Sequence, residues 1–246
     1  MCGLTGILMR HSDNAGSLSS LLIEMTSALF HRGPDAEGLW TEGSIGLGHR
    51  RLSILDPGPS GSQPMHSTCG RFVVAFNGEI YNHLDMRRDL VDGGVQLNWR
   101  GHSDTETLLA GIAHWGLDET LRRAKGMFAV ALWDRKGRQL HLARDRIGEK
   151  PLYWGWAGNS LVFASELKAL RRHPDFPRTI DRSALAQYLR FSYVPAPYSI
   201  HPGIFKLEPG CILTVNELPP TVPLLRPLRV GERHQTVSIR RYWSLN

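Results

Sequence analysis

The chain has 246 residues, of which 41% are hydrophobic and 21% are charged. This composition is close to that of an average globular protein, so we expect one large domain with a sizeable core. The formal net charge of +6 is compatible with a nucleic-acid partner, but the basic residues are dispersed and form no known nucleic-acid-binding pattern, so such a partner is not expected.

The first predicted element is a strand at the N-terminus. Residues 2–9, "CGLTGILM", form a short apolar run that is typical of a buried strand. Most chain termini are poorly ordered. A buried strand that begins at residue 2 would instead fix the N-terminus inside the fold. Residues 17–30 carry apolar side chains at helical spacing and predict an amphipathic helix, which Gly33 and Pro34 would end.

Further strands are predicted where apolar runs alternate with turn signals. The connections between them are too short for crossover helices, so the strand pairs should be antiparallel. The predicted strands are 44–56, 71–82, 127–134, 139–144, 151–156 and 160–165.

Helices are predicted between and after these strands, at 83–92, 104–116, 165–170 and 181–190. Because strand runs and helix runs do not alternate regularly, the pattern indicates an α+β domain with helices packed on antiparallel sheets.

Beyond residue 190 the sequence becomes irregular and rich in proline. Residues 216–228, "NELPPTVPLLRPL", are typical of a linker or a surface excursion. We therefore expect a compact domain over 2–215 and a Pro- and Arg-rich linker over 216–246.

The chain contains three cysteines, Cys2, Cys69 and Cys211, which are far apart and have no Cys-x-x-Cys spacing. This pattern predicts neither a zinc site nor a disulfide framework, and it favours a reducing compartment. The sequence has no secretion-signal pattern, and no apolar run approaches the roughly 18 residues that a membrane-spanning helix needs. We expect a cytoplasmic protein without a membrane partner.

The position of Cys2, directly after the initiator methionine, allows two interpretations. Free cysteine packs like a small hydrophobic residue and is usually inert, so Cys2 could be a core filler. Removal of Met1 would instead place a thiol and a free α-amine on one residue, which gives a nucleophile with its own base.

Four polar stretches stand out, and each has a structural explanation of its own. Asn77-Gly78 is typical of a tight hairpin turn. "SDTE" is typical of a helix start in which Ser103 caps the helix and the Glu106 side chain reaches back to it. The stretches are "HRGPD" at 31–35, "GHRRLSILD" at 48–56, "FNGEIYN" at 76–82 and "GHSDTE" at 101–106.

Together with Cys2, these stretches occur in a longer ordered series of motifs. The series is "MCGLTGI", "HRGPD", "RLSILD", "FNGEIYN", "SDTE", "GMFAVALWD", "ARDRIGEKPLYW" and "FASELKAL". It resembles the N-terminal glutaminase domain of glutamine-hydrolysing asparagine synthetase, a class II glutamine amidotransferase. The resemblance continues through "YLRFSYVPAPYSIHPGIFKLEPG" to "RRYWSLN" and so covers essentially the whole chain.

The resemblance implies a fold and a mechanism. The family fold is the N-terminal-nucleophile hydrolase sandwich, in which two stacked antiparallel sheets are flanked by helices (αββα). After removal of Met1, Cys2 would attack the side-chain carboxamide of L-glutamine, with its own α-amine as base. The Asn77 side-chain amide and the Gly78 backbone N–H would stabilise the oxyanion. Water would then hydrolyse a γ-glutamyl thioester, giving glutamate and ammonia without a metal or an organic cofactor.

The resemblance also implies which residues bind the substrate. Arg51 corresponds to the arginine that binds the α-carboxylate, although the adjacent Arg50 leaves that choice open. Asp104 and Glu79 would bind the α-ammonium group. Ile54 is a further substrate-binding residue.

Two features of these motifs are assigned no catalytic role. "HRGPD" is interpreted as architectural, with Arg32 and Asp35 ordering the loop beside the nucleophile. His31 and His49 are not expected to be catalytic bases, because the α-amine already fills that role.

The resemblance further implies a partner. Members of the family carry a second domain that activates aspartate with Mg-ATP and captures the ammonia, and its "SGG-x-D-S" loop does not occur in this sequence. We expect that the synthetase domain belongs to a longer protein or acts in trans, and we favour a truncated chain. Alternatives are an amidotransferase domain for another carboxylate acceptor, and a non-catalytic module that binds glutamine or a scaffold partner. A homodimer is also left open.

Overall fold

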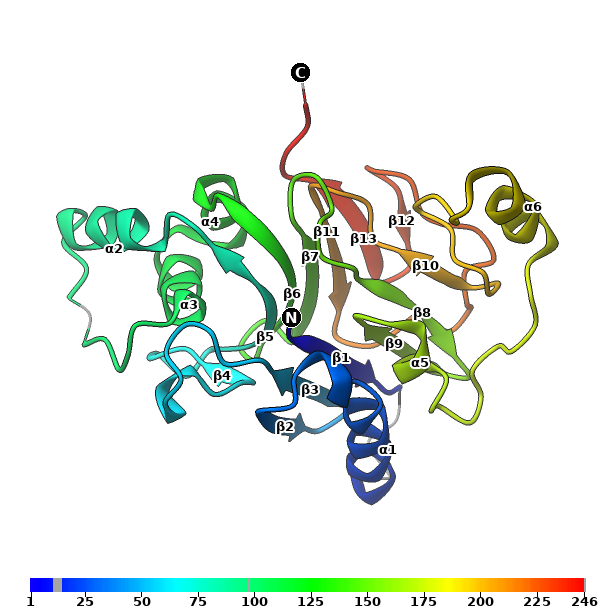
Figure 1. Ribbon diagram of the computed structural model, residues 1–246, viewed down its shortest axis with the longest axis horizontal. Helices are drawn as coiled ribbons and strands as arrows, with labels where there is room; N and C mark the ends of the chain where they lie inside the picture. Colours follow the sequence, from blue (N-terminus) through cyan, green and yellow to red (C-terminus); the bar gives the residue numbers. More distant parts are fainter. Residues whose placement is uncertain (11–14, 97, 246) are drawn as a thin grey trace.

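The computed structural model describes residues 1–10, 15–96 and 98–245. Within these residues the strands form two sheets that stack face to face, and helices cover the outer face of each sheet (Figure 1). All the strand pairings are antiparallel, as predicted. The layers therefore follow the order helix, sheet, sheet, helix.

The described strands divide into a six-stranded and a seven-stranded sheet. The first has the order β10-β8-β9-β1-β3-β2, and the second has the order β12-β13-β11-β7-β6-β5-β4. The first sheet contains β1 (Gly3–Leu8), β2 (Ala36–Glu42), β3 (Ile45–Arg51), β8 (Tyr153–Ala157), β9 (Ser160–Ala164) and β10 (Ile204–Lys206). The second contains β4 (Met65–His66), β5 (Phe72–Ile80), β6 (Gly126–Asp134), β7 (Gln139–Arg144), β11 (Cys211–Asn216), β12 (Arg233–His234) and β13 (Val237–Arg241).

Helices on the two outer faces bury different sets of side chains. α1 (Ala15–Ser27) and α5 (Leu167–Leu170) pack on the first sheet, and α2 (His83–Asp92), α3 (Asp104–Trp115) and α4 (Leu117–Arg123) cover the second. α6 (Arg182–Phe191) lies beyond β10 at the edge of the first sheet (Figure 1). Two short 3-10 turns are η1 (Phe30–Arg32) and η2 (Pro59–Gly61).

The central strands are buried on both faces, which explains their nearly continuous apolar sequence. In β5, Val73 and Ala75 point into the core between the sheets, while Val74 and Phe76 point toward the helices of the outer layer. All four are at most 2% exposed. Burial of a large apolar side chain stabilises the fold by about 1.5–3 kcal/mol, so the two cores together hold β5 in place.

The predicted hairpins 127–144 and 151–165 are present as β6-β7 and β8-β9. The strand predicted over 44–56 is shorter and ends at Arg51 as β3, which pairs with β1 and β2. β2 was not predicted, because its sequence "AEGLWTE" contains few apolar residues and its side chains alternate between half-buried and exposed. The helix predicted over 17–30 ends at Ser27, and η1 follows it.

The segment 216–246, expected as a linker, contributes two strands to the second sheet as far as the structure describes it. β13 pairs with β11, with Val215 opposite Val237, and β12 pairs with β13. Val237 and Ile239 are buried, because alternate side chains of this short strand face the core between the sheets. The folded sheet therefore extends to Arg241, and the proline-rich stretch is a connection between β11 and β12. Asn246 lies outside the described residues.

The described helices include none that is both long enough and apolar enough to cross a membrane.

Candidate active site

The N-terminus lies near the middle of the molecule at the start of β1 (Figure 1), and Cys2 is the residue that directly precedes this strand. Gly3 is the first residue of β1 and lies opposite Arg50 of β3, so the residue before it reaches the end of β3. The Cys2 Sγ donates to the carbonyl of Leu52 at 3.7 Å and accepts from the Leu52 N–H at 3.4 Å. Arg32 Nε donates to the Cys2 carbonyl at 2.9 Å. The N-terminus is thus held on both sides, as its sequence predicts.

All the residues predicted for the site line one open pocket, which encloses about 600 Å³ including its mouth. They come from four separate parts of the chain: the N-terminus, the end of β3 with the loop that follows it, the end of β5 and the start of α3. The residues are Cys2, Arg51, Ile54, Asn77, Gly78, Glu79 and Asp104. The fold therefore brings together residues that are more than 100 positions apart in the sequence.

Asn77 and Gly78 lie within β5, so the interpretation of this dipeptide as a tight turn is wrong. They pair with Ala129 and Phe128 of β6. The Asn77 side chain is buried, and neither its Oδ1 nor its Nδ2 has a hydrogen-bond partner within the part of the chain that the structure describes. An unpaired buried polar group costs about 1–3 kcal/mol, so a polar group bound in the pocket would relieve that cost.

Gly78 leaves no room for a side chain. A Cβ placed on this residue would lie 2.3 Å from the carbonyl oxygen of Met127 and 2.7 Å from Phe128 Cα. Because both of those atoms belong to the backbone of β6, the strand would have to move to accept an alanine. The close approach of the two strands requires glycine at this position.

Arg51 lines the pocket and holds the loop that follows β3. Its Nη1 donates to the carbonyl of Gly58 at 2.9 Å, and its Nη2 donates to the carbonyls of Leu55 and Asp56. A guanidinium has five N–H donors, so Arg51 keeps capacity for a further acceptor.

Arg50 points in the other direction. Its Nε donates to the Gly33 carbonyl at 2.9 Å, its Nη1 pairs with Glu37 at 2.8 Å, and its guanidinium lies over the Phe30 ring. Of the two adjacent arginines, the structure therefore places Arg51 in the pocket and Arg50 in the loop region before β2.

Asp104 is a buried carboxylate at the start of α3. Its Oδ2 accepts from the Ile80 N–H at 2.9 Å, which ties the helix start to the end of β5. Burial raises the pKa of Asp104, against the lowering effect of the Ile80 hydrogen bond and of His83 nearby. Glu79 lies next to it on the pocket wall. This wall carries two carboxyl groups that suit a cationic group of a ligand.

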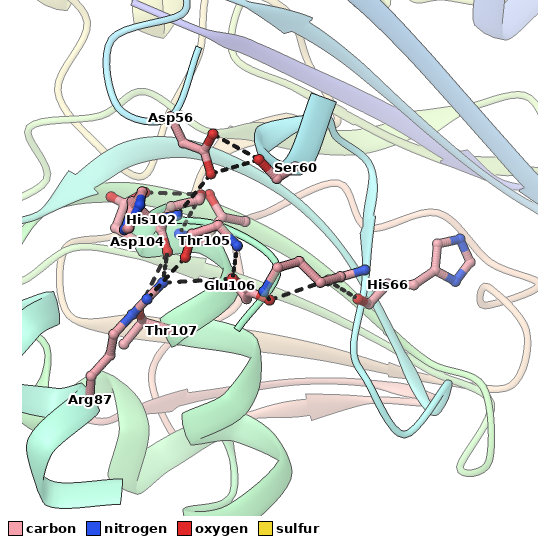
Figure 2. Close-up of polar contacts among 12 residues, drawn as sticks. Asp56, Ser60, His66, Arg87, His102, Asp104, Thr105, Glu106 and Thr107 are labelled. Carbon is pink, nitrogen blue, oxygen red and sulfur yellow. Dashed lines mark hydrogen bonds and ion pairs between the residues drawn. The ribbon is translucent and has the colours of Figure 1, made fainter. Parts of the chain in front are cut away.

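The predicted helix start, capped by Ser103, is confirmed. The Glu106 side chain, however, does not bond back to the cap residue as expected. Ser103 Oγ accepts from the Thr105 N–H at 3.1 Å. Glu106 accepts instead from the backbone N–H groups of Arg100 and Gly101, at 2.9 and 3.2 Å (Figure 2). Its carboxylate thus orders the loop before the cap residue.

Arg87 of α2 fastens the same loop from the other side (Figure 2). Its guanidinium donates to the carbonyls of Gly101 and Ser103, both at 3.0 Å, and to Thr107 Oγ1 at 2.8 Å. It also lies 3.9 Å from the centroid of the Trp99 ring. Because these contacts flank Asp104 in the sequence, Arg87 fixes where that carboxylate stands in the pocket.

Asp56 joins the loop after β3 to the loop before α3 (Figure 2). Its carboxylate accepts from Ser60 Oγ at 2.8 and 2.9 Å and from the His102 N–H at 2.9 Å. Burial raises the pKa of Asp56, but these hydrogen bonds outweigh it, so the net shift is downward. At neutral pH the ionised carboxylate therefore connects two loops whose neighbouring residues line the pocket.

The Cys2 thiol is protonated at neutral pH. Burial raises its pKa, and this effect outweighs the lowering by the Leu52 hydrogen bond, the terminal amine and Arg51. A thiolate is the reactive form, so a base must remove the proton before Cys2 can act as a nucleophile.

His49 does not supply that base. It is fully buried, its Nε2 lies 3.0 Å from the Phe76 carbonyl, and burial lowers its pKa to about 4. A neutral imidazole in this place connects β3 to β5 and does not line the pocket.

The sequence analysis missed several residues of the pocket wall. Gln63 accepts from the Phe76 N–H at 2.6 Å and donates to Thr105 Oγ1 at 3.3 Å, so it connects β5 to α3. Lys150 is buried, and its Nζ lies 3.0 Å from Met1 Sδ. Lys150 lies in the quoted segment "ARDRIGEKPLYW", but no local pattern distinguishes it from a solvated lysine. The other residues are Met1, Leu52, Leu55, Gly61, Phe76, Ser103, Thr105 and Met127.

Metal binding finds no support in the side-chain arrangement. Across the described ranges, no group of three or more His, Cys, Asp and Glu residues is placed to hold a metal ion.

Comparison with known proteins gives a family match over most of the chain. Residues 1–221 match the family described as "Glutamine amidotransferase domain". Glutamine-hydrolyzing asparagine synthetase 1 of Bacillus subtilis (strain 168) is 37% identical over 217 residues, which are 88% of this chain and 34% of that protein. A putative glutamine-hydrolyzing asparagine synthetase of Mycobacterium tuberculosis (strain ATCC 25618 / H37Rv) is 37% identical over 241 residues, or 90% of this chain and 36% of that protein. The chain thus spans about a third of the length of these relatives.

Solved structures show the same architecture. Glutamine phosphoribosylpyrophosphate amidotransferase of B. subtilis matches with a TM-score of 0.65 at 20% identity, over 100% of this chain and 50% of that one. The allosteric regulatory enzyme of purine biosynthesis matches with a TM-score of 0.66 at 19% identity, over the same shares. At these identities the likeness concerns the fold alone, and it confirms the predicted two-sheet sandwich.

Proposed function

The chain belongs to the glutamine amidotransferase domain family and has the fold of the N-terminal-nucleophile hydrolases, and from this premise we propose that it hydrolyses L-glutamine to glutamate and ammonia. In this proposal, Cys2 becomes the first residue after removal of Met1 and forms a γ-glutamyl thioester. The chain covers the amidotransferase part of glutamine-hydrolysing asparagine synthetases.

The proposal depends above all on the unpaired amide of Asn77. This side chain is buried, lacks a partner among the described residues, and lines the same pocket as the Cys2 thiol. A tetrahedral intermediate of acyl transfer carries an oxyanion that needs preorganised donors. We assign the Asn77 Nδ2 and the Gly78 N–H to that oxyanion, which would satisfy the donor that the empty pocket leaves unpaired.

The first half of the reaction forms the thioester. The Cys2 α-amine takes the thiol proton, and the sulfur attacks the Cδ carbon of the glutamine side chain. The C–S bond forms while the carbonyl electrons move onto oxygen. When the carbonyl is restored, the C–N bond breaks, and the α-ammonium returns its proton to the leaving nitrogen, which departs as ammonia.

The second half regenerates the enzyme. The neutral α-amine removes a proton from water, and the resulting hydroxide attacks the thioester carbon. The same oxyanion donors stabilise the second tetrahedral intermediate. The C–S bond then breaks, and the sulfur recovers a proton from the α-ammonium as glutamate leaves. These steps use groups of this chain alone, whereas Mg-ATP would act only in a synthetase domain.

The substrate would be held by charges at both ends of its backbone. Arg51 would bind the α-carboxylate with its remaining donors, and Asp104 and Glu79 would bind the α-ammonium group. Ile54 is 68% exposed at the pocket mouth and would pack against the bound substrate.

The ammonia would be passed to a synthetase domain that is joined to this one or acts in trans. The named relatives are asparagine synthetases about three times as long as the chain, so we propose aspartate as the carboxylate that is finally amidated. None of the pocket residues contacts that acceptor in this proposal, and another carboxylate acceptor would require no change in them.

Intact-mass spectrometry with a glutamine analogue tests the proposal. The untagged protein would be incubated with 6-diazo-5-oxo-L-norleucine, the adduct mapped by peptide sequencing, and glutamate release measured on the same preparation. We expect loss of Met1, one adduct on Cys2 and release of glutamate. A Cys69→Ala protein is the matched control, because Cys69 is exposed and lies outside the pocket. A processed protein without an adduct or turnover would support a glutamine-binding module instead.

A further inference from the structure

Lys150 is a buried lysine on the pocket wall to which the proposed reaction assigns no role. It is 4% exposed, and it lies in the loop between β7 and β8. Its backbone is held tightly, because its N–H donates to Asp145 Oδ2 at 2.9 Å and its carbonyl accepts from Arg144 Nε at 2.7 Å. These hydrogen bonds fix the position of the Lys150 Cα, from which the side chain extends.

The ammonium group of Lys150 has an unusual environment. Its contact is with Met1 Sδ at 3.0 Å, and no carboxylate within the described chain forms an ion pair with it. Burial of a charge without a partner of opposite charge is costly. These contacts give the buried charge beside Met1 no structural role, so a functional role is considered.

We propose that Lys150 is an electrostatic positioning residue whose positive charge keeps the freed α-amine of Cys2 unprotonated, so that the amine can accept the thiol proton. The proposal rests on the proposed glutaminase function of Cys2. Lys150 itself neither contacts the glutamine nor transfers a proton in this scheme.

Removal of Met1 creates the situation in which this charge acts. The thioether that contacts Lys150 leaves, and the nitrogen of Cys2 changes from a peptide N–H into an ionisable amine in the same pocket. Two cations close together disfavour each other, and the more weakly basic one loses its proton. An α-amine has an ordinary pKa of about 7.7–8.0, so a neighbouring positive charge that lowers this pKa leaves the amine unprotonated near neutral pH.

Besides Lys150, the charged groups that line the pocket around the amine are one cation and two carboxyl groups. Arg51 of β3 is a second cation, whereas Asp104 of α3 and Glu79 of β5 are carboxyl groups. Arg32 of η1, which donates to the Cys2 carbonyl, is paired with Glu166.

Bound glutamine would bring a carboxylate to Arg51 and an ammonium to the two carboxyl groups. Lys150 would contact neither charged group of the substrate, so its effect on the amine should persist in the complex.

Two substitutions separate charge from packing. Lys150→Met keeps the length of the side chain and removes the charge, and Lys150→Arg keeps the charge. We expect the acidic limb of the kcat/KM pH profile to move up by about 1 pH unit in Lys150→Met, which lowers activity on that limb about tenfold. Lys150→Arg should keep the midpoint of the original protein. A purely structural lysine would change the rate without moving the limb.

A direct titration makes the test independent of turnover. In a Cys2→Ala background, the α-amine of residue 2 would be titrated by ¹⁵N NMR with Lys150 intact and with Lys150→Met. An upward shift of the amine midpoint in Lys150→Met supports the proposal, and equal midpoints overturn it. If Lys150→Met does not fold, Lys150→Gln takes its place. Absence of turnover in the original protein would defeat the glutaminase proposal, whereas the amine titration would still decide the role of Lys150.

Discussion

The Cys2 thiol lies against the backbone of Leu52, with its Sγ 3.7 Å from the carbonyl oxygen and 3.4 Å from the nitrogen of that residue. Leu52 is the first residue after β3, so the nucleophile and the loop that Arg51 holds are directly connected. Burial raises the pKa of the thiol and outweighs the lowering effect of the Leu52 hydrogen bond, so the thiol stays protonated and unreactive until a base acts.

Replacement of this thiol should abolish turnover without abolishing binding. Cys2→Ala removes the atom that forms the thioester and leaves Arg51, Glu79 and Asp104 in place. We expect no glutamate release above background, and a dissociation constant for glutamine within a few-fold of the original by calorimetry. Substantial residual turnover would remove Cys2 from the role of nucleophile.

Asn77→Ala should lower the activity without lowering the stability of the fold. Among the described residues the amide has no hydrogen-bond partner, so its removal takes away an unsatisfied buried group and should leave the melting temperature unchanged or higher. Loss of one oxyanion donor should lower kcat by about 10²–10³-fold with a smaller effect on KM. A lower melting temperature with unchanged kcat would contradict the assignment of this side chain to the oxyanion.

Arg87 should affect the binding of glutamine indirectly, because it fixes the position of Asp104. Arg87→Ala removes the donors to Gly101 and Ser103, so the loop before α3 should loosen and KM for glutamine should rise, by about tenfold if roughly 1.4 kcal/mol of binding is lost. Steady-state kinetics would measure the change. The neighbouring Arg88 is the matched control, because it is exposed and its ion pair among the described residues is with Asp85 of the same helix. Equal effects of Arg87→Ala and Arg88→Ala would exclude this positioning role.

The roles of the candidate site residues stay predictions, whereas their convergence on one pocket is a feature of the structure. Seven candidate residues were chosen from short motifs, and all of them line one pocket. These residues were named from the resemblance to a known family, because neither spacing nor periodicity shows that such distant segments meet. Lys150 and Gln63 were missed because only burial and contacts between distant segments distinguish them from ordinary loop residues.

The errors in secondary structure have a common physical origin. The strand predicted over 71–82 is present as β5, and only the alternative interpretation of Asn77-Gly78 as a turn is wrong, because the cores on both faces of β5 override that local preference. β12 and β13 are short and follow a proline-rich segment, and their pairing partner β11 is distant enough that local sequence gives little signal. In both places, contacts between residues distant in the sequence determine the strand.

Truncation should show that the C-terminal strands belong to the domain. A chain that ends at Asn216 loses β13 together with the buried Val237, Ile239 and Tyr242. Each such side chain contributes about 1.5–3 kcal/mol, and the sum is comparable to the whole net stability of a domain, about 5–15 kcal/mol. We expect insoluble or unfolded protein by circular dichroism. A chain that ends at Ser244 is the control, since Leu245 is 86% exposed. A folded chain ending at Asn216 would restore the linker interpretation.

Asp104→Asn should raise the stability of the protein without substrate and weaken the binding of glutamine. Burial raises the pKa of this carboxyl above its ordinary value of 3.8, so the folded state binds the proton more tightly than the unfolded state does. Its ionised form therefore costs stability at neutral pH, and the cost disappears as the pH falls below 3.8. Asparagine removes that cost, can still accept from the Ile80 N–H, and loses the charge that would bind the substrate ammonium.

The pH dependence of unfolding and the KM for glutamine together measure both effects. At pH 7 we expect Asp104→Asn to melt at an equal or higher temperature than the original protein and to have a KM raised by roughly 10- to 100-fold, with the thermal advantage shrinking toward pH 4. Asp118→Asn is the control with the opposite sign, because the hydrogen bond from Arg240 lowers the pKa of Asp118 and its charge stabilises the fold at neutral pH. That variant should melt at a lower temperature and keep its KM, since Asp118 lies in α4 and does not line the pocket. A destabilised Asp104→Asn protein with unchanged KM would make Asp104 a structural cap and would leave the substrate ammonium to Glu79.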